Sequence, residues 1–260
     1  MQTIRIGSVS FLNAKPLIYG LEEIPGIKLQ LEVPSRLIDG LLEDRFDVAL
    51  LPVIDYQRMD GLRILTSGGI ACDGPTLTVR VFSPTPIEQI RTLACDTDSH
   101  TSVALARVLL SERYSITPEF VPLDGISPDD RCIARLLIGD KVVCEEPKDF
   151  PHQLDLGEAW KAQTGLPFVF ACWMARDGID LGDLPMQLAA AKRNGLANVE
   201  SIIERFAIPR GWRPDAAREY LTRYLQFDIT SRHLEAIRLF HRKARALGLI
   251  PGELRELQIV

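Results

Sequence analysis

Apolar and polar residues alternate with two different periods along the first part of the chain, typical of strands and of helices. The pattern predicts strands over 3–9, 28–33 and 47–51 and helices over 14–22 and 36–43. Strands and helices that follow one another in this way form a parallel sheet with helices packed on its faces. The N-terminal part is therefore predicted to be an α/β lobe built on a βαβαβ unit.

A second α/β rhythm follows the prolines of the segment 83–86. It predicts strands over 92–95, 119–121 and 141–144 and a helix over 99–110. The apolar segment 168–174 is consistent with a strand that returns to the first lobe. Beyond Met186 the apolar residues recur every 3.6 positions, which predicts helices over 188–206, 215–226 and 231–247.

This order of elements predicts one lobe that is interrupted by another. We expect a first lobe of residues 1–82 and 173–260, including the C-terminal helices, and a second lobe of residues 83–172. Two crossings of the chain then leave a cleft between the lobes. We expect Thr78–Pro86 and Phe170–Arg176 to act as hinges, because both segments would carry the chain across and allow the cleft to close on a ligand.

Composition narrows the classes of partner. The net charge is −5, and lysine and arginine are scattered without a basic run, which argues against nucleic-acid binding. No apolar run approaches the roughly 20 residues that span a bilayer, so we expect no membrane partner. The first residues show no charged segment followed by an apolar one, because strand-like sequence begins by Thr3. We therefore expect a cytoplasmic protein.

Motifs for common cofactors are missing from the sequence. The five cysteines are odd in number and lack CxxC spacing, and the four histidines form no HxxxH or HxH pair. We therefore expect reduced cysteines in the core and no metal site. GxSxG, GxxxxGK[ST] and a GxGxxG after a strand are also absent. Neither a nucleotide cofactor nor serine-hydrolase chemistry is indicated, and we expect no cofactor.

Two polar clusters lie where a predicted strand ends and a predicted helix opens: Ser8, Ser10 and Asn13 in the first lobe, and Ser99, Thr101 and Ser102 in the second. Ligands of open α/β sheets bind at the carboxyl ends of strands, and helix N-termini favour anions. Ser99 is also a typical N-cap residue, so a capping sequence without a ligand would explain the second cluster equally well. On opposite sides of a cleft, the two clusters would hold a ligand with a carboxylate at each end.

Other candidate residues carry weaker signals. Thr76 and Thr78 share one face of a predicted strand and could line the cleft, although threonine is common in strands for its own sake. Asp140 follows Gly139 at a strand end and could bind substrate, but such a residue is more often part of a turn. His100 and His152 are possible acid–base groups, but a lone histidine is usually structural or exposed.

Several of these segments together resemble the chorismate dehydratases of the futalosine pathway of menaquinone biosynthesis. The resemblance extends over roughly residues 4–176, and the helical tail is compatible with it. Phe11 stands where tyrosine is common in that family, and Thr78 where serine is usual. The matching segments are Arg5–Asn13 with Pro16–Leu17, Val33–Ser35, Asp96 with Ser99 and Thr101–Ser102, Leu137–Asp140, Asp155–Gly157 with Trp160, and Thr164–Ala171 with Trp173.

The resemblance implies a type II periplasmic-binding-protein-like fold that serves as a cofactor-free enzyme. The implied reaction, that of a carbon–oxygen hydro-lyase, converts chorismate, a small dicarboxylate, to 3-[(1-carboxyvinyl)oxy]benzoate and water. We expect Asn13 to orient the reacting centre through the leaving hydroxyl, and the enolpyruvyl carboxylate of the substrate to take the proton. In this reading Thr78, Ser99, Thr101 and Ser102 hold the carboxylates.

Two other functions are compatible with such a fold. One is a solute-binding protein without chemistry. The lack of a leader disfavours a secreted receptor, and the lack of a helix-turn-helix segment disfavours the effector domain of a regulator. The other is the sister enzyme of the same pathway, which forms a naphthoate. The motif Phe11-Leu12-Asn13 with Pro16-Leu17 favours the dehydratase over this sister enzyme. Incubation with chorismate separates the three possibilities.

The sequence predicts that dehydration of chorismate needs no metal ion. Activity should be unchanged after dialysis against a chelator, because no Cys, His and carboxylate cluster has metal-ligand spacing. The measurement is the rate before and after dialysis, with a mock-dialysed sample as the control. A loss of rate that a divalent ion restores would contradict the prediction.

Overall fold

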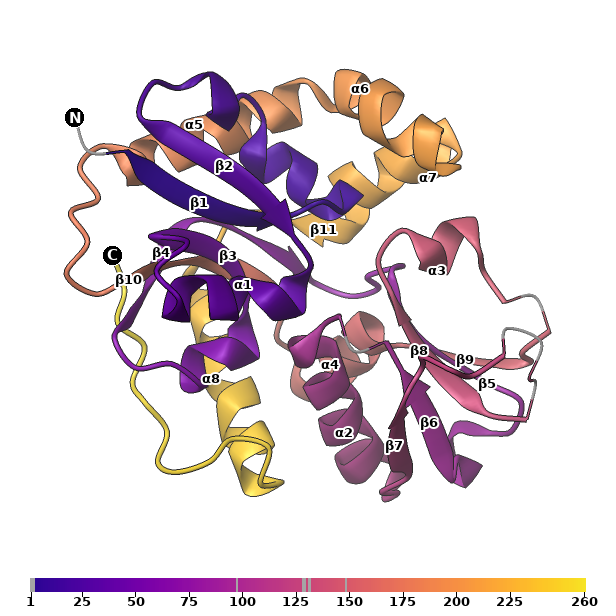
Figure 1. Cartoon of the computed structure of the whole chain (residues 1–260). Helices are drawn as coiled ribbons and strands as arrows, with labels where there is room; N and C mark the ends of the chain where they lie inside the picture. Colours follow the sequence, from indigo (N-terminus) through magenta and orange to yellow (C-terminus); the bar gives the residue numbers. More distant parts are fainter. Residues whose placement is uncertain (1–2, 97, 128–129, 131, 148) are drawn as a thin grey trace.

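The computed structural model describes residues 3–96, 98–127, 130, 132–147 and 149–260. Within them the strands form two sheets, one of six strands in the order β11-β4-β10-β3-β1-β2 and one of five in the order β7-β6-β8-β5-β9 (Figure 1). The first sheet contains β1 (Ile4–Val9), β2 (Ile27–Glu32), β3 (Val48–Pro52), β4 (Leu62–Cys72), β10 (Phe168–Arg176) and β11 (Leu225–Gln226). The second contains β5 (Val79–Ser83), β6 (Thr92–Cys95), β7 (Glu119–Pro122), β8 (Ala134–Ile138) and β9 (His152–Asp155).

The first sheet confirms the α/β prediction and adds antiparallel strands to it. Strand β1 pairs in parallel with β2 and β3, with Ile6 opposite both Leu29 and Val48. Strand β10 runs antiparallel between β3 and β4. Every residue of β3 is buried, as expected of a strand that is covered on both faces. The sheet is therefore mixed rather than purely parallel.

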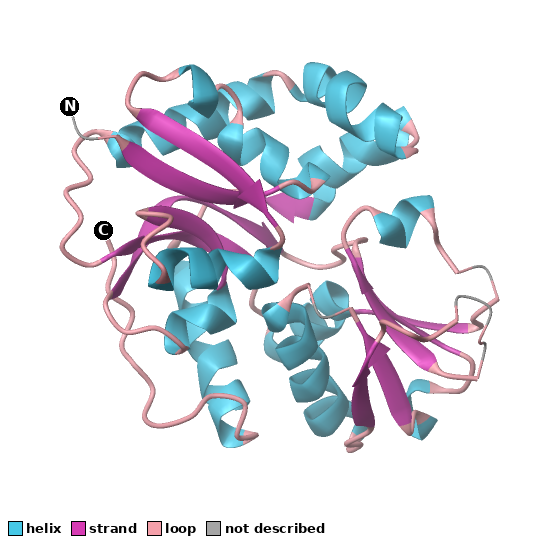
Figure 2. Cartoon of the chain, viewed as in Figure 1, coloured by secondary structure: helices cyan, strands magenta, loops and turns pink. Residues whose placement is uncertain are grey.

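The α-helices surround and connect the two sheets (Figure 2). Helix α5 packs against β4 and the 3-10 helix η1 (Leu12–Ile18), whereas α2 contacts α4 in its own lobe and α8 of the C-terminal part. No helix in the described part of the chain is both long and apolar enough to cross a membrane. The helices are α1 (Pro34–Leu42), α2 (His100–Tyr114), α3 (Lys141–Cys144), α4 (Leu156–Thr164), α5 (Leu184–Ala197), α6 (Val199–Ile202), α7 (Pro214–Glu219) and α8 (Ser231–Ala246).

One large hydrophobic core includes residues of both lobes, and a smaller cluster lies within the second lobe. Trp160 of α4, Phe168 of β10 and Phe240 of α8 meet edge to face, with ring centroids 5.1–6.1 Å apart. All three side chains are almost fully buried. The indole N–H of Trp160 donates to the carbonyl of Pro167 (2.9 Å), so this large side chain is buried without an unpaired polar atom. Aromatic packing therefore joins the lobes on one side of the cleft.

The segment 141–144, predicted as a strand, is the short helix α3. Gly139 has a φ of 72°, in the left-handed region, and turns the chain at the end of β8. The amides of Val142 and Val143 then donate to the carbonyls of Gly139 and Asp140 (both 3.1 Å). A short apolar run does not distinguish a strand from a helix, which explains the error. Similarly, the helix predicted over 14–22 is the 3-10 turn η1 followed by η2 (Leu21–Glu23).

The chain changes sheet at positions that differ from the expected boundaries and hinges. It leaves the first sheet after Cys72 and enters the second at Val79, and it returns through α4 before Phe168. The expected hinge Thr78–Pro86 contains β5, and Phe170–Arg176 lies within β10, so both are largely strands inside a sheet. The prolines that suggested a crossing form a turn within the second lobe, where Ser83 Oγ donates to the carbonyl of Thr85 (2.7 Å).

The carboxylate of Asp155 joins the two crossings. It accepts hydrogen bonds from the amides of Thr76 and Leu77 (3.0 and 2.8 Å) on the outgoing segment. It also accepts from the amides of Gly157 and Glu158 (2.9 and 3.1 Å), which caps α4 on the returning segment. Leu77 has a φ of 68°, an unfavourable value for a side chain of this type. The hydrogen bond from its amide helps to hold this backbone.

The C-terminal helix α8 is fixed to the first lobe by a buried histidine. His241 donates from Nε2 to the carbonyl of Val53 (2.8 Å) and accepts at Nδ1 from the amide of Gln57 (3.0 Å). Both partners lie in the 3-10 helix η3 (Val53–Gln57). These two contacts suit the neutral ring, and burial lowers the pKa of His241 from 6.5 to about 4.

We predict that acid removes the contribution of His241 to stability. The unfolded chain binds the proton more readily, so the stabilisation is present above pH 6.5 and is lost as the pH falls towards 4. A shift of this size corresponds to about 3 kcal/mol. The difference in free energy of unfolding between the wild type and His241→Gln, measured with urea, should therefore shrink between pH 6.5 and 4. A difference that stays constant over this range would contradict the prediction.

Candidate functional site

A cavity lies where the two lobes meet. It contains about 550 Å³ of space that protein atoms do not fill, part of it open to solvent. Its wall comes from the ends of β1, β3 and β8, from the crossing before β5, from the start of α2 and from the C-terminal part. The lining residues are Val9, Phe11, Asn13, Pro34, Leu50, Pro52, Ile70, Thr76, Thr78, Val79, Ser99, Ser102, Ile138, Gly139, Phe170, Ala171, Tyr220 and Leu225.

The cavity wall is mainly apolar, with a few neutral polar groups. Among the residues that the structure describes, no lysine, arginine, histidine or carboxylate lines it. The polar side chains are one amide and five hydroxyls: Asn13, Thr76, Thr78, Ser99, Ser102 and Tyr220. Hydrogen bonds and dipoles act more strongly between such apolar walls than in water. The site is therefore suited to bind and orient a polar ligand with neutral groups.

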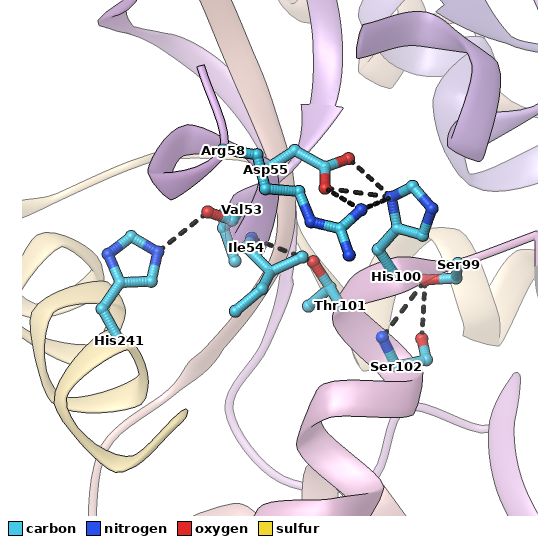
Figure 3. A network of polar contacts seen from close by, with 9 residues as sticks. All are labelled: Val53, Ile54, Asp55, Arg58, Ser99, His100, Thr101, Ser102 and His241. Atoms are coloured by element: carbon cyan, nitrogen blue, oxygen red, sulfur yellow. Dashed lines mark hydrogen bonds and ion pairs between the residues drawn. The ribbon is translucent and has the colours of Figure 1, made fainter. Parts of the chain in front are cut away.

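The start of α2 supplies one polar end of the cavity. Ser99 caps the helix, and its Oγ accepts from the amide of Ser102 (3.2 Å) and lies 2.9 Å from the Ser102 hydroxyl. Both serines line the cavity, and they are shown together in Figure 3. The positive end of the 15-residue helix α2 favours negative charge at this place.

Asn13 supplies an unpaired acceptor at another part of the wall. It lies in η1, directly after Phe11 and Leu12. Its amide oxygen is buried and has no hydrogen-bond partner among the described residues. A buried polar atom without a partner costs about 1–3 kcal/mol. In a cavity-lining residue, this is the kind of group that a ligand satisfies.

The structure brings Asn13, Thr76, Thr78, Ser99 and Ser102 together at the cavity, as the sequence predicted. Four other predicted residues do not line it: Ser8, Ser10, Thr101 and Asp140. Ser8 is fully buried in β1 and Ser10 is exposed just beyond it, whereas Val9 between them faces the cavity. Side chains alternate between the two faces of a strand, so Val9 and the two serines cannot share one direction.

Thr101 and Asp140 hold the lobes together instead. Thr101 Oγ1 accepts from the amide of Ile54 (3.2 Å), because one helical step turns it away from Ser99 and Ser102 towards η3. Asp140 accepts from the amide of Leu12 (3.3 Å) in the first lobe and pairs with Arg210 (3.6 Å). Burial raises the pKa of Asp140 above its usual value. Both residues are best described as contacts between the lobes.

His100 completes this set of contacts (Figure 3). Its Nδ1 lies 2.9 Å from the carboxylate of Asp55 in η3 and 2.9 Å from the guanidinium of Arg58. Arg58 approaches the same carboxylate (3.3 Å), and the side chain of Asp55 is fully buried. The contacts of His100 and Thr101 with η3 therefore fix the position of the α2 N-terminus, and with it the two serines, relative to the first lobe.

Sequence reasoning missed Tyr220 as a site residue. It begins the π-helix η7 (Tyr220–Tyr224), and its phenol oxygen lies 2.7 Å from Thr78 Oγ1. Its surrounding sequence has ordinary helical periodicity, which indicates a core position. Short π-helical segments are frequent at functional sites, and this one would have indicated Tyr220 as a site residue. Such a segment is recognised only in the structure.

Comparisons with known proteins identify the family of this chain. Residues 4–246 match the model of a family described as menaquinone biosynthesis. The chain belongs to this menaquinone biosynthesis family. A relative named chorismate dehydratase from Thermus thermophilus is 28% identical over 243 residues, covering 85% of this chain and 88% of its own. Another of that name, from Campylobacter jejuni, is 28% identical over 251 residues, covering 94% and 98%.

Solved structures of other proteins share the fold of this chain. Protein AF1704 from Archaeoglobus fulgidus superposes with a TM-score of 0.76 at 20% identity, over 95% of this chain and 98% of its own. The periplasmic aliphatic sulphonate binding protein SsuA from Escherichia coli gives a TM-score of 0.69 at 12% identity, over 98% and 90%. The predicted periplasmic-binding-protein-like fold is therefore confirmed.

No group of three or more His, Cys, Asp and Glu in the described residues is arranged to hold a metal ion.

We predict that His100 stabilises the junction of the lobes. His100→Ala should lower the free energy of unfolding by about 1–3 kcal/mol, because the buried carboxylate of Asp55 loses one of its polar contacts. His100→Gln, which keeps a donor N–H, should recover part of this loss. Urea denaturation at neutral pH measures both. Equal stability of the alanine variant and the wild type would show that the contact contributes nothing.

Proposed function

We propose that this protein is a chorismate dehydratase that converts chorismate to 3-[(1-carboxyvinyl)oxy]benzoate and water in the futalosine pathway of menaquinone biosynthesis. It is then a carbon–oxygen hydro-lyase. Two relatives that match most of the chain carry the name chorismate dehydratase. The observation that carries the proposal is the cavity between the lobes, in which neutral donors and the unpaired amide oxygen of Asn13 surround an otherwise apolar space.

The reaction needs orientation more than a strong base. The C3 proton of chorismate is acidified through vinylogous conjugation with the ring carboxylate. Loss of this proton and of the C4 hydroxyl creates a C3–C4 double bond and an aromatic ring, and the two lost groups leave together as water. A dry cavity with fixed donors supports such a step by holding the reacting conformation and stabilising charge as it develops. In this proposal the enolpyruvyl carboxylate of the substrate takes the C3 proton and passes it to the leaving C4 oxygen, so water departs and the carboxylate is restored.

The polar groups of the cavity then have separate roles. Ser99 and Ser102 bind one substrate carboxylate with the help of the α2 N-terminus. Thr76, on the crossing between the lobes, binds the other carboxylate. Asn13 orients the reacting centre through its unpaired amide oxygen. Because these groups come from both lobes, a substrate with two carboxylates contacts all of them only when the lobes are together.

Turnover of chorismate tests the function directly. Purified protein should change the ultraviolet spectrum of chorismate, and mass spectrometry should detect a product that is lighter by one water. A solute-binding protein would bind chorismate without changing it. The sister enzyme of the pathway would leave chorismate unchanged as well. Either result would overturn the proposal.

We predict that Asn13→Ala removes most of the turnover and leaves the fold intact. The loss should be on the order of a hundredfold in kcat, because one oriented polar contact to the transition state disappears. Asn198→Ala is the matched control, since Asn198 is exposed and its side-chain amide contacts only the carbonyl of Asn194 within the described residues. Near-native turnover of a folded Asn13→Ala protein would exclude this role.

A further inference from the structure

Tyr220 is held rigidly against the cavity. Its side chain is only 1% exposed, and the ring stacks on Trp212 with centroids 5.1 Å apart. Its phenol oxygen lies 2.7 Å from Thr78 Oγ1, which is also buried. Burial raises the pKa of the phenol well above its usual value, so the group keeps its proton at neutral pH. Tyr220 therefore presents a fixed, neutral hydroxyl at the cavity wall.

The hydroxyls of Thr78 and Tyr220 together keep one O–H that is not used in the hydrogen bond between them. Thr78 and Tyr220 carry one O–H proton each, and the hydrogen bond between them uses one of the two. Whichever oxygen donates within the pair, the other O–H remains for a further acceptor. Both residues line the cavity, so a ligand bound there can accept this proton.

Asn13 presents the opposite polarity beside this pair. Its side chain lies close enough to the phenol to oppose the effect of burial on the pKa of Tyr220. Its amide oxygen has no donor among the described residues. The same part of the cavity therefore offers one free donor and one free acceptor. A hydroxyl group, which both donates and accepts, is complementary to this combination, whereas a carboxylate can only accept.

We infer that Asn13, Thr78 and Tyr220 form a subsite for a ligand hydroxyl, and that Tyr220 contacts the substrate. The inference rests on the proposed function, in which the ring hydroxyl at C4 of chorismate occupies the subsite. The hydroxyl donates to the Asn13 oxygen and accepts from the Thr78–Tyr220 pair. The accepted hydrogen bond stabilises the oxygen as the C4–O bond breaks and its electron pair moves onto the oxygen. Thr78 is thereby assigned to the hydroxyl rather than to a carboxylate.

Comparison of substrate and product tests the subsite, because the product keeps both carboxylates but lacks the ring hydroxyl. Tyr220→Phe should lower kcat/KM for chorismate at least about tenfold. Its Kd for 3-[(1-carboxyvinyl)oxy]benzoate, measured by calorimetry, should stay within about twofold of the wild-type value. Thr78→Val should give the same separation of the two measurements. Tyr224→Phe, in the same π-helix but outside the cavity lining, is the control and should change neither.

Each other outcome has a distinct meaning. Unchanged turnover in folded Tyr220→Phe overturns the inference alone. Equal losses of turnover and of product affinity in both variants also overturn it, because they indicate a carboxylate contact or a structural role. If Tyr220→Phe does not fold, Thr78→Val decides between these results. A wild-type protein that neither converts chorismate nor binds the product overturns the proposed function and the inference together.

Discussion

The architecture of the site depends on one half-buried carboxylate, that of Asp155. Asp155 accepts four backbone amides, two from the segment that leaves the first sheet and two from the start of α4, which brings the chain back. Gly157 packs so tightly beside it that a Cβ at this position would lie 2.5 Å from the Cys72 sulfur. The two crossings thus form one joint. Thr76 and Thr78 extend from this joint into the cavity, so the geometry of the site follows from the way in which the lobes are connected.

The chemistry proposed for the cavity needs no charged side chain in its wall. In the described part of the chain the charged groups near the junction are engaged elsewhere: Asp55 with His100 and Arg58, and Asp140 with the amide of Leu12 and with Arg210. They set the position of the lobes, whereas neutral hydroxyls and an amide face the ligand. This division is suited to a reaction driven by aromatisation, for which placement and exclusion of water are enough.

The sequence was sufficient for the class of the fold and for five of the residues that line the cavity. The residues Asn13, Ser99 and Ser102 follow strand ends at helix starts, and this local signal placed them at the cavity. This signal did not predict which way each side chain points. The alternation along β1 turns Ser8 and Ser10 away from the face of Val9. One helical step turns Thr101 towards η3. Tyr220 reaches the cavity only through a π-turn and long-range packing. The chain crossings were misplaced because Pro84 and Pro86 mark a turn within the second lobe, whereas the true crossing depends on Asp155, 78 residues away from Leu77.

The place of β10 in the first sheet constrains how the protein is made. β3 and β4 are consecutive in sequence, yet in the sheet β10 lies between them. Residues 168–176 leave the ribosome only after all strands of the second sheet have been synthesised. Until then the nascent chain exposes two strands whose shared partner does not yet exist, and open strand edges are prone to wrong pairing. The first lobe begins earlier in the sequence, but its sheet can be completed only after the strands of the second lobe have been synthesised.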